Sequence, residues 1–167
     1  RGVPSFLLYF VFIGAGYIMV EVALIQKFVL FLGHPTYALT VVIFSMLVSS
    51  GLGSYYSRRF VGENTDDGRL MKTLGLVAIL VAVVSLVAFA LLGRLVGLPL
   101  WLKAAMTAAM IFPAGFVMGV PFPSGLKRLE KWHRPSVRWA WSLNAAASVL
   151  GSVLALVCAI YLGLVQT

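Results

Sequence analysis

The sequence predicts an all-α integral membrane protein, a bundle of about five transmembrane helices. Of the 167 residues, 61% are hydrophobic and only 11% are charged. Soluble globular domains are about 45–50% apolar and about 25% charged, so this apolar excess is too large for one buried core. The mean hydropathy of +1.00 points the same way. The apolar residues also fall into five long runs rather than being scattered along the chain.

Each apolar run is long enough to cross a bilayer, because a spanning helix needs about 20 mostly apolar residues. The predicted helices cover residues 5–32, 36–55, 70–96, 101–120 and 137–164. Together they form a single transmembrane helical domain over residues 1–167. The chain opens with Arg1 rather than methionine, and no secretory signal pattern precedes the first run. We therefore expect a fragment or module of a larger protein.

The connections between these helices differ in character. The first is GHP at residues 33–35, so the first two helices should form a tight antiparallel hairpin. The longest polar stretch is SRRFVGENTDDGR at residues 57–69, and it should lie in water. The basic stretch PFPSGLKRLEKWHRPS occupies residues 121–136. It should hold a short interfacial helix over 124–133, because its large apolar side chains recur at three-residue spacing.

The basic residues predict the orientation in the membrane. With five crossings, ten of the 13 lysines and arginines lie on the side of the N-terminus and three on the other side. The positive-inside rule then places the N-terminus in the cytoplasm and the C-terminus outside. We expect a multi-pass protein of the bacterial inner membrane, with anionic lipid headgroups attracted to the cytoplasmic basic residues. The ten are Arg1, Arg58, Arg59, Arg69, Lys72, Lys127, Arg128, Lys131, Arg134 and Arg138, and the three are Lys27, Arg94 and Lys103.

Glu21 is the most informative polar side chain, because it lies inside the first apolar run. A carboxylate facing lipid at mid-membrane costs roughly 2.5–3.5 kcal/mol on insertion scales. Glu21 should therefore face protein, be protonated, or pair with a cation. At a rise of about 1.5 Å per residue, Tyr37, Thr40 and Lys103 reach a similar depth. These residues form a candidate intramembrane polar site, through an ion pair with Lys103 or a hydrogen bond with Tyr37. The alternative is a satisfied polar contact between helices.

Small and polar residues mark the expected contacts between helices. Small side chains at four-residue spacing let helix backbones approach closely in lipid. The predicted packing residues are Gly115, Gly119, Asn144, Ser148, Gly151 and Ser152. The turn between the first two helices should be formed by Gly33, His34 and Pro35, and no second metal ligand lies at suitable spacing from His34.

No arrangement of residues in the sequence predicts catalysis. We find no nucleophile with a base and an orienting group, and no glycine-rich phosphate motif. The GAG at residues 14–16 lies inside a membrane helix without a preceding strand, so it is not a dinucleotide site. Cys158 is the single cysteine and cannot form an intrachain disulfide. We expect no catalytic residue, cofactor or metal in this chain, and no nucleic-acid partner.

Three stretches of the sequence together resemble a known family. They are GYIMVEVALIQKFVLFLGHPTYALTVVIFSMLVSSGLGS at residues 16–54, GFVMGVPFPSGLKRL at 115–129 and WAWSLNAAASVLGSVLA at 139–155. In order and spacing they are similar to the C-terminal membrane region of bacterial membrane-integrated spermidine synthase-like proteins. The family couples a polyamine aminopropyltransferase-like domain to multi-helix membrane regions. The resemblance implies that any such activity lies in a domain absent from this chain. The positions that match are Glu21, Gln26, Gly33, His34, Pro35, Tyr37, Pro121, Pro123, Asn144 and Gly151.

Two functions remain open at this point. The first is a non-catalytic membrane anchor or scaffold, which holds a cytoplasmic soluble domain or serves as an accessory subunit of a larger membrane complex. Few charges inside the apolar runs and the small-residue contacts favour it. The second is part of a transporter for a polyamine-like small molecule, with Glu21 attracting a cation. Five helices are few for a complete carrier, so this function would need a dimer or further helices.

Overall fold

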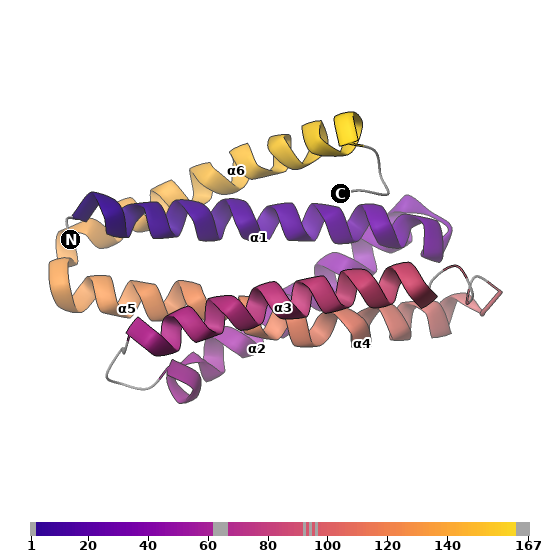
Figure 1. Ribbon diagram of the computed structural model, residues 1–167, viewed down its shortest axis with the longest axis horizontal. Coiled ribbons are helices and arrows are strands. Elements are labelled where there is room, and N and C mark those ends of the chain that lie inside the picture. Colours follow the sequence, from indigo (N-terminus) through magenta and orange to yellow (C-terminus); the bar gives the residue numbers. More distant parts are fainter. Residues whose placement is uncertain (1–2, 62–66, 92, 94, 96, 163–167) are drawn as a thin grey trace.

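The computed structural model describes residues 3–61, 67–91, 93, 95 and 97–162. Over these residues the chain is helical with short turns and no strand, so the predicted all-α class is confirmed. Figure 1 shows the helices stacked side by side along one long axis. They are α1 (Val3–Leu32), α2 (Pro35–Val61), α3 (Asp67–Leu91), α4 (Leu100–Met118), α5 (Pro121–His133), the short 3-10 helix η2 (Arg134–Ser136) and α6 (Val137–Leu162).

The observed helix ends differ from the predicted ones mainly around the long polar connection. α2 continues past the predicted end at Tyr55 to Val61, and α3 begins at Asp67 and ends at Leu91 rather than at residue 96. Much of the stretch 57–69, predicted to be a loop, is therefore helical, and residues 62–66 lie outside the described part. Helical backbone bonds its own N–H and C=O groups, and arginine is a good helix former. Both effects favour extending a helix into water.

Four segments are long and apolar enough to cross a membrane, which confirms the membrane class. They are Val3–Leu32, Pro35–Ser57, Gly68–Ala90 and Leu100–Tyr161. The last segment is 62 residues long and contains α4, α5 and most of α6. The described chain thus has the helices of a multi-pass membrane protein.

α1 and α6 lie side by side and run in the same direction (Figure 1). The Asn144 side chain of α6 bonds to Phe10 of α1, and the Ser148 side chain bonds to Gly14. Both pairs have the same sequence separation of 134 residues, so moving one turn along α6 moves one turn along α1. A constant separation of this kind is the signature of a parallel helix pair.

Two apolar cores hold the bundle together. The larger one lies where α1, α2, α3 and α4 meet, and its members include Phe28, Met46 and Ile111, all fully buried. The smaller one joins α1 to α5 and α6 through Phe10 and Leu129, which are also fully buried. The second core explains why α5 and α6 belong to the same body as the first four helices.

α5 packs against the bundle rather than lying apart in a connection. In Figure 1 it continues the line of α4 and runs beside the first turns of α1. The Tyr9 hydroxyl donates a hydrogen bond to the Pro121 carbonyl at 2.8 Å, and Gly125 contacts the Tyr9 ring. The helix predicted over 124–133 therefore exists, three residues longer at its start. Leu129 of its predicted apolar face is fully buried in the smaller core, whereas Trp132 of the same face is 53% exposed.

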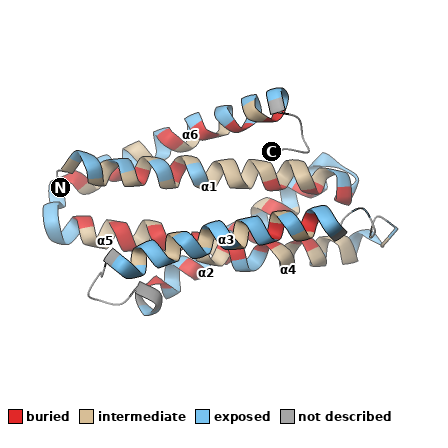
Figure 2. Cartoon of the chain, in the orientation of Figure 1, coloured by how far each residue is buried: buried red, intermediate tan, exposed pale blue. Residues whose placement is uncertain are grey.

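The outward faces of the helices are apolar. Figure 2 shows exposed residues along the outer sides of α3 and α6. Among them are Leu86 and Phe89 of α3, exposed at 69% and 75%, and Leu150 and Ile160 of α6, exposed at 71% and 78%. Soluble monomers rarely expose contiguous apolar patches of more than a few hundred Å². A surface of this kind suits contact with lipid chains.

Candidate functional site

Glu21 lies on α1 one turn beyond Tyr17, on the side of the helix that turns toward α2. The Tyr17 and Ser50 hydroxyls are 3.1 Å apart and share a hydrogen bond. This contact fixes the register of the antiparallel α1–α2 hairpin, because it places residue 17 level with residue 50. In that register Glu21 is level with Met46, deep in the bundle, and the Glu21 side chain is half-buried.

Tyr37 and Thr40, predicted to lie beside Glu21, sit near the hairpin turn instead. In the same register they are roughly six to nine residues from Glu21 along α1, or about 9–14 Å at the helical rise. Tyr37 is 48% exposed, and its ring centre lies 5.7 Å from that of His34. The Thr40 hydroxyl donates to the Thr36 carbonyl of its own helix at 2.9 Å. Neither side chain reaches the Glu21 carboxylate.

Lys103, the predicted cation partner of Glu21, also lies at the turn end of α1. Its Nζ is 5.6 Å from the centre of the Phe31 ring. Phe31 follows Glu21 by about ten residues, which corresponds to about 15 Å along the helix axis. The predicted Glu21–Lys103 pair is therefore not formed. Within the part of the chain that the structure describes, no hydrogen bond or ion pair reaches the Glu21 carboxylate.

The GHP turn has a purely conformational explanation. Gly33 has φ of +80°, a left-handed conformation that favours glycine, and its N–H bonds to the Val29 carbonyl at 3.0 Å. Pro35 is the first residue of α2, where a missing N–H costs nothing. The Nδ1 atom of His34 accepts a hydrogen bond from the Thr36 N–H at 3.2 Å. His34 thus satisfies one of the free N–H groups at the start of α2.

The α1–α6 contact contains three of the predicted packing residues. The Asn144 amide donates to the Phe10 carbonyl at 3.0 Å. The Ser148 hydroxyl lies 3.2 Å from the Gly14 carbonyl and 2.9 Å from the carbonyl of Asn144. Gly151 lies so close to α1 that an added Cβ would meet the Ala15 backbone at 2.9 Å. Ser152, the other predicted packing residue on α6, instead donates a hydrogen bond to the Val149 carbonyl of its own helix at 2.8 Å.

The α2–α4 contact is a second glycine seam. On α4, Gly115 lies against the Ser49 side chain of α2. One turn further, Gly119 lies against the Ser50 backbone. Gly53 of α2 sits against the α4 backbone in the same way. Glycine at these positions lets the two backbones approach more closely than any side chain would allow.

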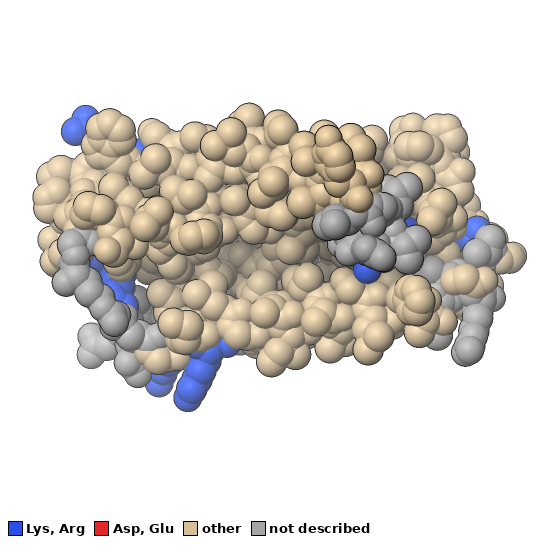
Figure 3. Space-filling view, turned by 45° about the horizontal axis from the view of Figure 1, so that its top comes forward, with Lys and Arg blue, Asp and Glu red and all other residues tan. Residues whose placement is uncertain are grey.

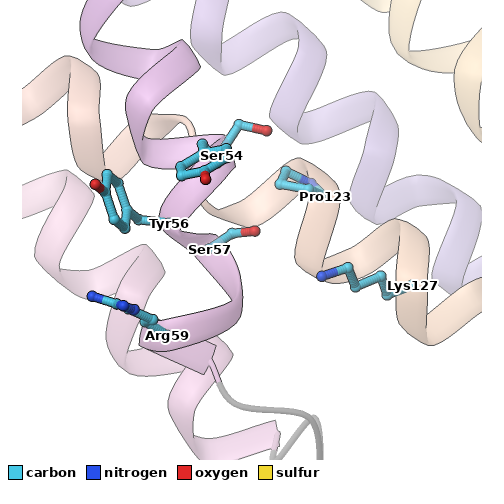
Figure 4. Close-up of a pocket in the computed structure, with 7 residues that line it drawn as sticks. Ser54, Tyr56, Ser57, Arg59, Pro123 and Lys127 are labelled. Carbon is cyan, nitrogen blue, oxygen red and sulfur yellow. The ribbon is translucent and has the colours of Figure 1, made fainter.

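A pocket of about 610 Å³ opens between the last turns of α2 and the first turns of α5 (Figure 4). It is lined by Ser54, Tyr55, Tyr56, Ser57, Arg59, Pro123 and Lys127. In Figure 4 the Lys127 ammonium points from α5 toward Ser57 of α2. Arg59 lies at the rim, with its guanidinium carbon 5.8 Å from the Tyr56 ring centre. In the same view Ser54 and Ser57 lie on the side of α2 that faces Pro123 and Lys127, while Tyr56 and Arg59 extend from the other side of α2 (Figure 4).

Sequence reasoning placed Arg59 and Lys127 on the same side of the membrane but did not predict that both border one pocket. The hydroxyl-bearing residues Ser54, Tyr56 and Ser57 were missed. The available signal was the polar run SYYSRR at residues 54–59, which ends an otherwise apolar helix. Because α2 continues through that run, its hydroxyls point to different sides of one helix: Ser54 and Ser57 lie toward α5, and Tyr56 lies on the opposite side (Figure 4).

A smaller cavity of about 230 Å³ lies between α1, α3 and α6. Its lining is mostly apolar and includes Met19, Leu24, Val81 and Ala155. Glu21 is not among the residues that the structure places around it. Cys158 lines the cavity and has a free thiol. The described His, Cys, Asp and Glu residues form no group of three that could hold a metal ion.

Comparison with known proteins gives no relative for this chain. No family model matches the sequence, and neither a curated protein nor a solved structure matches it significantly. Its function must therefore be argued from the contacts themselves.

Proposed function

We propose that this chain is a five-crossing module of the bacterial inner membrane, with its N-terminus in the cytoplasm and its C-terminus outside. The parallel α1–α6 pair supports an odd number of crossings, since both helices must then traverse the membrane in the same direction. α4 has 19 residues and α6 has 26. At the helical rise they are about 29 Å and 39 Å long, enough for a hydrocarbon core of about 30 Å.

Two layers of cations support this placement. Arg59 is level with about residue 8 of α1 in the hairpin register, and the Arg128 guanidinium lies 5.9 Å from the Phe6 ring centre. The second layer lies at the other end of α1. It consists of Lys27 on α1 and of Lys103, whose ammonium lies over the Phe31 ring. About 20 residues of α1 separate the layers, or about 30 Å, which equals the hydrocarbon thickness. Figure 3 agrees, because Lys and Arg gather toward the ends of the molecule and leave the centre of that face uncharged.

The positive-inside rule orients these layers, since most of the basic residues belong to the layer near the N-terminus. Arg1 and Arg94 lie outside the described residues, as does the Arg58 side chain. The described lysines and arginines still divide unequally between the two layers. The N-terminal layer contains Arg59, Arg69, Lys72, Lys127, Arg128, Lys131, Arg134 and Arg138, and the other contains Lys27 and Lys103.

Within the membrane, the module acts as a non-catalytic anchor or scaffold. The observation that carries this proposal is that three hydrogen bonds from polar side chains of the spans join one helix to another. Asn144 and Ser148 bond to α1 carbonyls, and Tyr17 bonds to Ser50 of α2. Groups committed to such contacts hold the helices in one arrangement and are not free to bind a passing solute. The cavity at this depth is small and mostly apolar.

The partner that such a scaffold holds follows from the resemblance described above. A cytoplasmic aminopropyltransferase-like domain is the first choice, and other subunits of a membrane complex are the second. The exposed basic residues of the N-terminal layer face the compartment in which a cytoplasmic partner would lie.

A second candidate, part of a transporter for a polyamine-like cation, is favoured by Glu21. This carboxylate lies about 20 Å from the Arg59 level and about 9 Å from the Lys27 level along α1. It has no bonded partner among the described residues. A cation passing through the membrane would find a counter-charge there.

Glu21→Gln separates the two functions. The full chain with its natural flanking sequence is expressed in a bacterial host, and both assembly and uptake of labelled putrescine and spermidine are measured. Glu130→Gln, a carboxylate outside the spans, is the matched control. A scaffold keeps its assembly and shows no uptake that depends on Glu21. Loss of uptake with intact assembly would overturn the scaffold function and establish the transporter.

A further inference from the structure

We infer that the cavity between α1, α3 and α6 holds one acyl chain of an anionic phospholipid, with the headgroup of that lipid at Lys27. The site requires that the protein spans a membrane. Neither the scaffold nor the transporter function needs it, so it goes beyond both. Four properties of the cavity support it: its origin in the packing, its opening, its dimensions, and the charge at one end.

The cavity arises where short side chains leave space between diverging helices. Gly151 holds α6 close against α1. Figure 1 shows α6 rising away from α1 beyond that contact, toward its C-terminal end. The side chains that face the widening space include Ala23 of α1 and Ala155 and Cys158 of α6. They are too short to fill it, and residues of α3 close the third side.

Neither water nor empty space suits this cavity. Its described lining is mostly apolar, and a buried water needs two to four polar partners. An empty space would deprive the lining of van der Waals contacts. Of the ten described lining residues, Leu24 and Ala155 are buried and the other eight are half-buried, so the cavity opens to the surface of the bundle. In a membrane, that opening meets lipid chains.

The dimensions of the cavity fit one hydrocarbon chain. Its lining extends along α1 from Met19 to Lys27, which is about 12 Å at the helical rise. Dividing the volume of about 230 Å³ by this length gives a mean cross-section of about 19 Å². A chain whose neighbours lie at about 4.0–4.5 Å occupies roughly 16–20 Å². One chain therefore fits, and two do not.

The depth of the cavity matches one leaflet of the bilayer. Lys27 lies in the cation layer at the end of α1 that is near the turn, and the cavity extends from there toward the middle of the membrane. Its length of about 12 Å is most of the hydrocarbon half-thickness of about 15 Å. In the orientation proposed above, this is the outer leaflet. The second chain of the lipid remains in the bilayer.

The charge at the surface end selects an anionic headgroup. Among the described lining residues the charge is carried by Lys27, and none carries a carboxylate. Lys27 has no ion-pair partner among the described residues. Glu21 does not border the cavity, although it lies on the same helix. A cation near the membrane surface attracts anionic lipids, so the Lys27 ammonium can hold the phosphate of the headgroup while the chain lies below it.

Native mass spectrometry of the purified full chain tests the headgroup. The protein is placed in phosphatidylcholine nanodiscs with increasing amounts of phosphatidylglycerol, and we expect one phosphatidylglycerol to be retained in preference to phosphatidylcholine. Lys27→Gln should weaken this retention about fivefold, the effect of one cation near a membrane surface. Lys103→Gln removes the other described cation of the same layer, which does not border the cavity, and should weaken retention less than twofold.

Filling the cavity tests the place of the acyl chain. Cys158→Phe adds a ring that occupies the space, and it should weaken retention of phosphatidylglycerol at least tenfold. Val157→Phe adds the same ring at the neighbouring residue, which is 42% exposed and does not border the cavity. This control should retain the lipid within twofold of the unaltered chain. Circular dichroism and size exclusion check that each variant is folded.

Photocrosslinking locates the chain in the unaltered protein, so it remains decisive if Cys158→Phe does not fold. Phosphatidylglycerol with a diazirine in one acyl chain is added to the same nanodiscs and illuminated, and the crosslinked peptides are mapped. We expect crosslinks to concentrate on residues 19–27, 81–85 and 155–158 and to decrease when unlabelled phosphatidylglycerol is added in excess.

Three results would overturn the inference. The first is crosslinks spread evenly over lipid-facing residues such as Leu86 and Leu150. The second is full retention of the lipid by a folded Cys158→Phe variant, which would mean that the chain lies elsewhere. The third is equal weakening by Lys27→Gln and Lys103→Gln, which would mean that this cation layer attracts anionic lipids without a defined site.

Discussion

Replacing Gly14 with alanine tests whether the α1–α6 contact is as tight as it looks. An alanine Cβ at this position would lie 2.7 Å from the Nδ2 atom of Asn144 and closer still to the Asn144 carbonyl oxygen. Non-bonded carbon atoms pack at about 3.5–4.0 Å, so α6 would have to move away by roughly 1 Å. The closest obstacle is backbone, which cannot rotate aside.

The magnitude follows from three contributions. Overpacking a well-packed contact costs about 1–3 kcal/mol. The movement would also lengthen the bonds from Asn144 to Phe10 and from Ser148 to Gly14, and such bonds average about 0.6 kcal/mol each in membranes. Because alanine is a better helix former than glycine, the substitution also stabilises α1 by up to about 1 kcal/mol. Gly14→Ala should therefore lower the free energy of unfolding by about 1–3 kcal/mol.

The assay is reversible unfolding in mixed micelles with increasing SDS, followed by far-UV circular dichroism. The matched control is Gly16→Ala, two residues away on the same helix, where an added Cβ meets nothing within 4 Å. That control should be neutral or slightly stabilising through helix propensity. If Gly14→Ala and Gly16→Ala unfold at the same SDS fraction, the close approach of α1 and α6 is refuted.

Three further substitutions follow from single contacts. Thr107→Val should raise the unfolding free energy by about 1 kcal/mol, because the Thr107 hydroxyl is buried without a hydrogen-bond partner among the described residues; a destabilised variant in the same SDS titration would contradict this. Tyr17→Phe should lower the unfolding free energy by about 0.6 kcal/mol, because it removes the hydrogen bond to Ser50. If the effects of Tyr17→Phe and Ser50→Ala simply add in the double variant, the bond is disproved. Gly33→Ala should cost about 1–2 kcal/mol because of its positive φ, measured as a lower thermal transition in detergent; an unchanged transition would show that the turn adjusts freely.

The helices themselves could be predicted from the sequence, because a run of apolar residues long enough to cross lipid has few alternatives to a helix. The α1–α2 turn could be predicted for a similarly local reason, since Gly33 and Pro35 restrict the backbone wherever they occur. Predictions of this kind depend on neighbours in the sequence. They do not require knowing which helices touch.

The contacts between helices could not be predicted with the same success. The partners chosen for Glu21 assumed that residues soon after the turn reach its depth, but the Tyr17–Ser50 contact sets a register in which they do not. Gly14 drew notice only as part of an unsuitable nucleotide motif, although it is a point of closest approach to α6. The spacing of apolar residues shows on which face of a helix a residue lies. It does not show which helices pack together or how far each is shifted along its neighbour.

The basic pocket shows the same limit. Its two cations come from separate helices, and each could be assigned to a side of the membrane by charge alone. That both border one pocket depends on α2 continuing to Val61 and on α5 following the line of α4. The short helix over 124–133 could be predicted from its apolar spacing, but the continuation of α2 to Val61 and the direction of α5 along α4 could not.

The pairing of α1 with α6 has a consequence for biosynthesis. The two helices are joined across 134 residues, which a ribosome adds in roughly 7–27 s at about 5–20 residues per second. During that interval the groove around Gly14 has no permanent occupant. The contact surface of α1 is thus covered only after α6 has been made, so a chain that stops before α6 leaves that surface exposed. Proteases and insertion factors that act on newly made membrane proteins could recognise an incomplete chain by this exposed surface of α1.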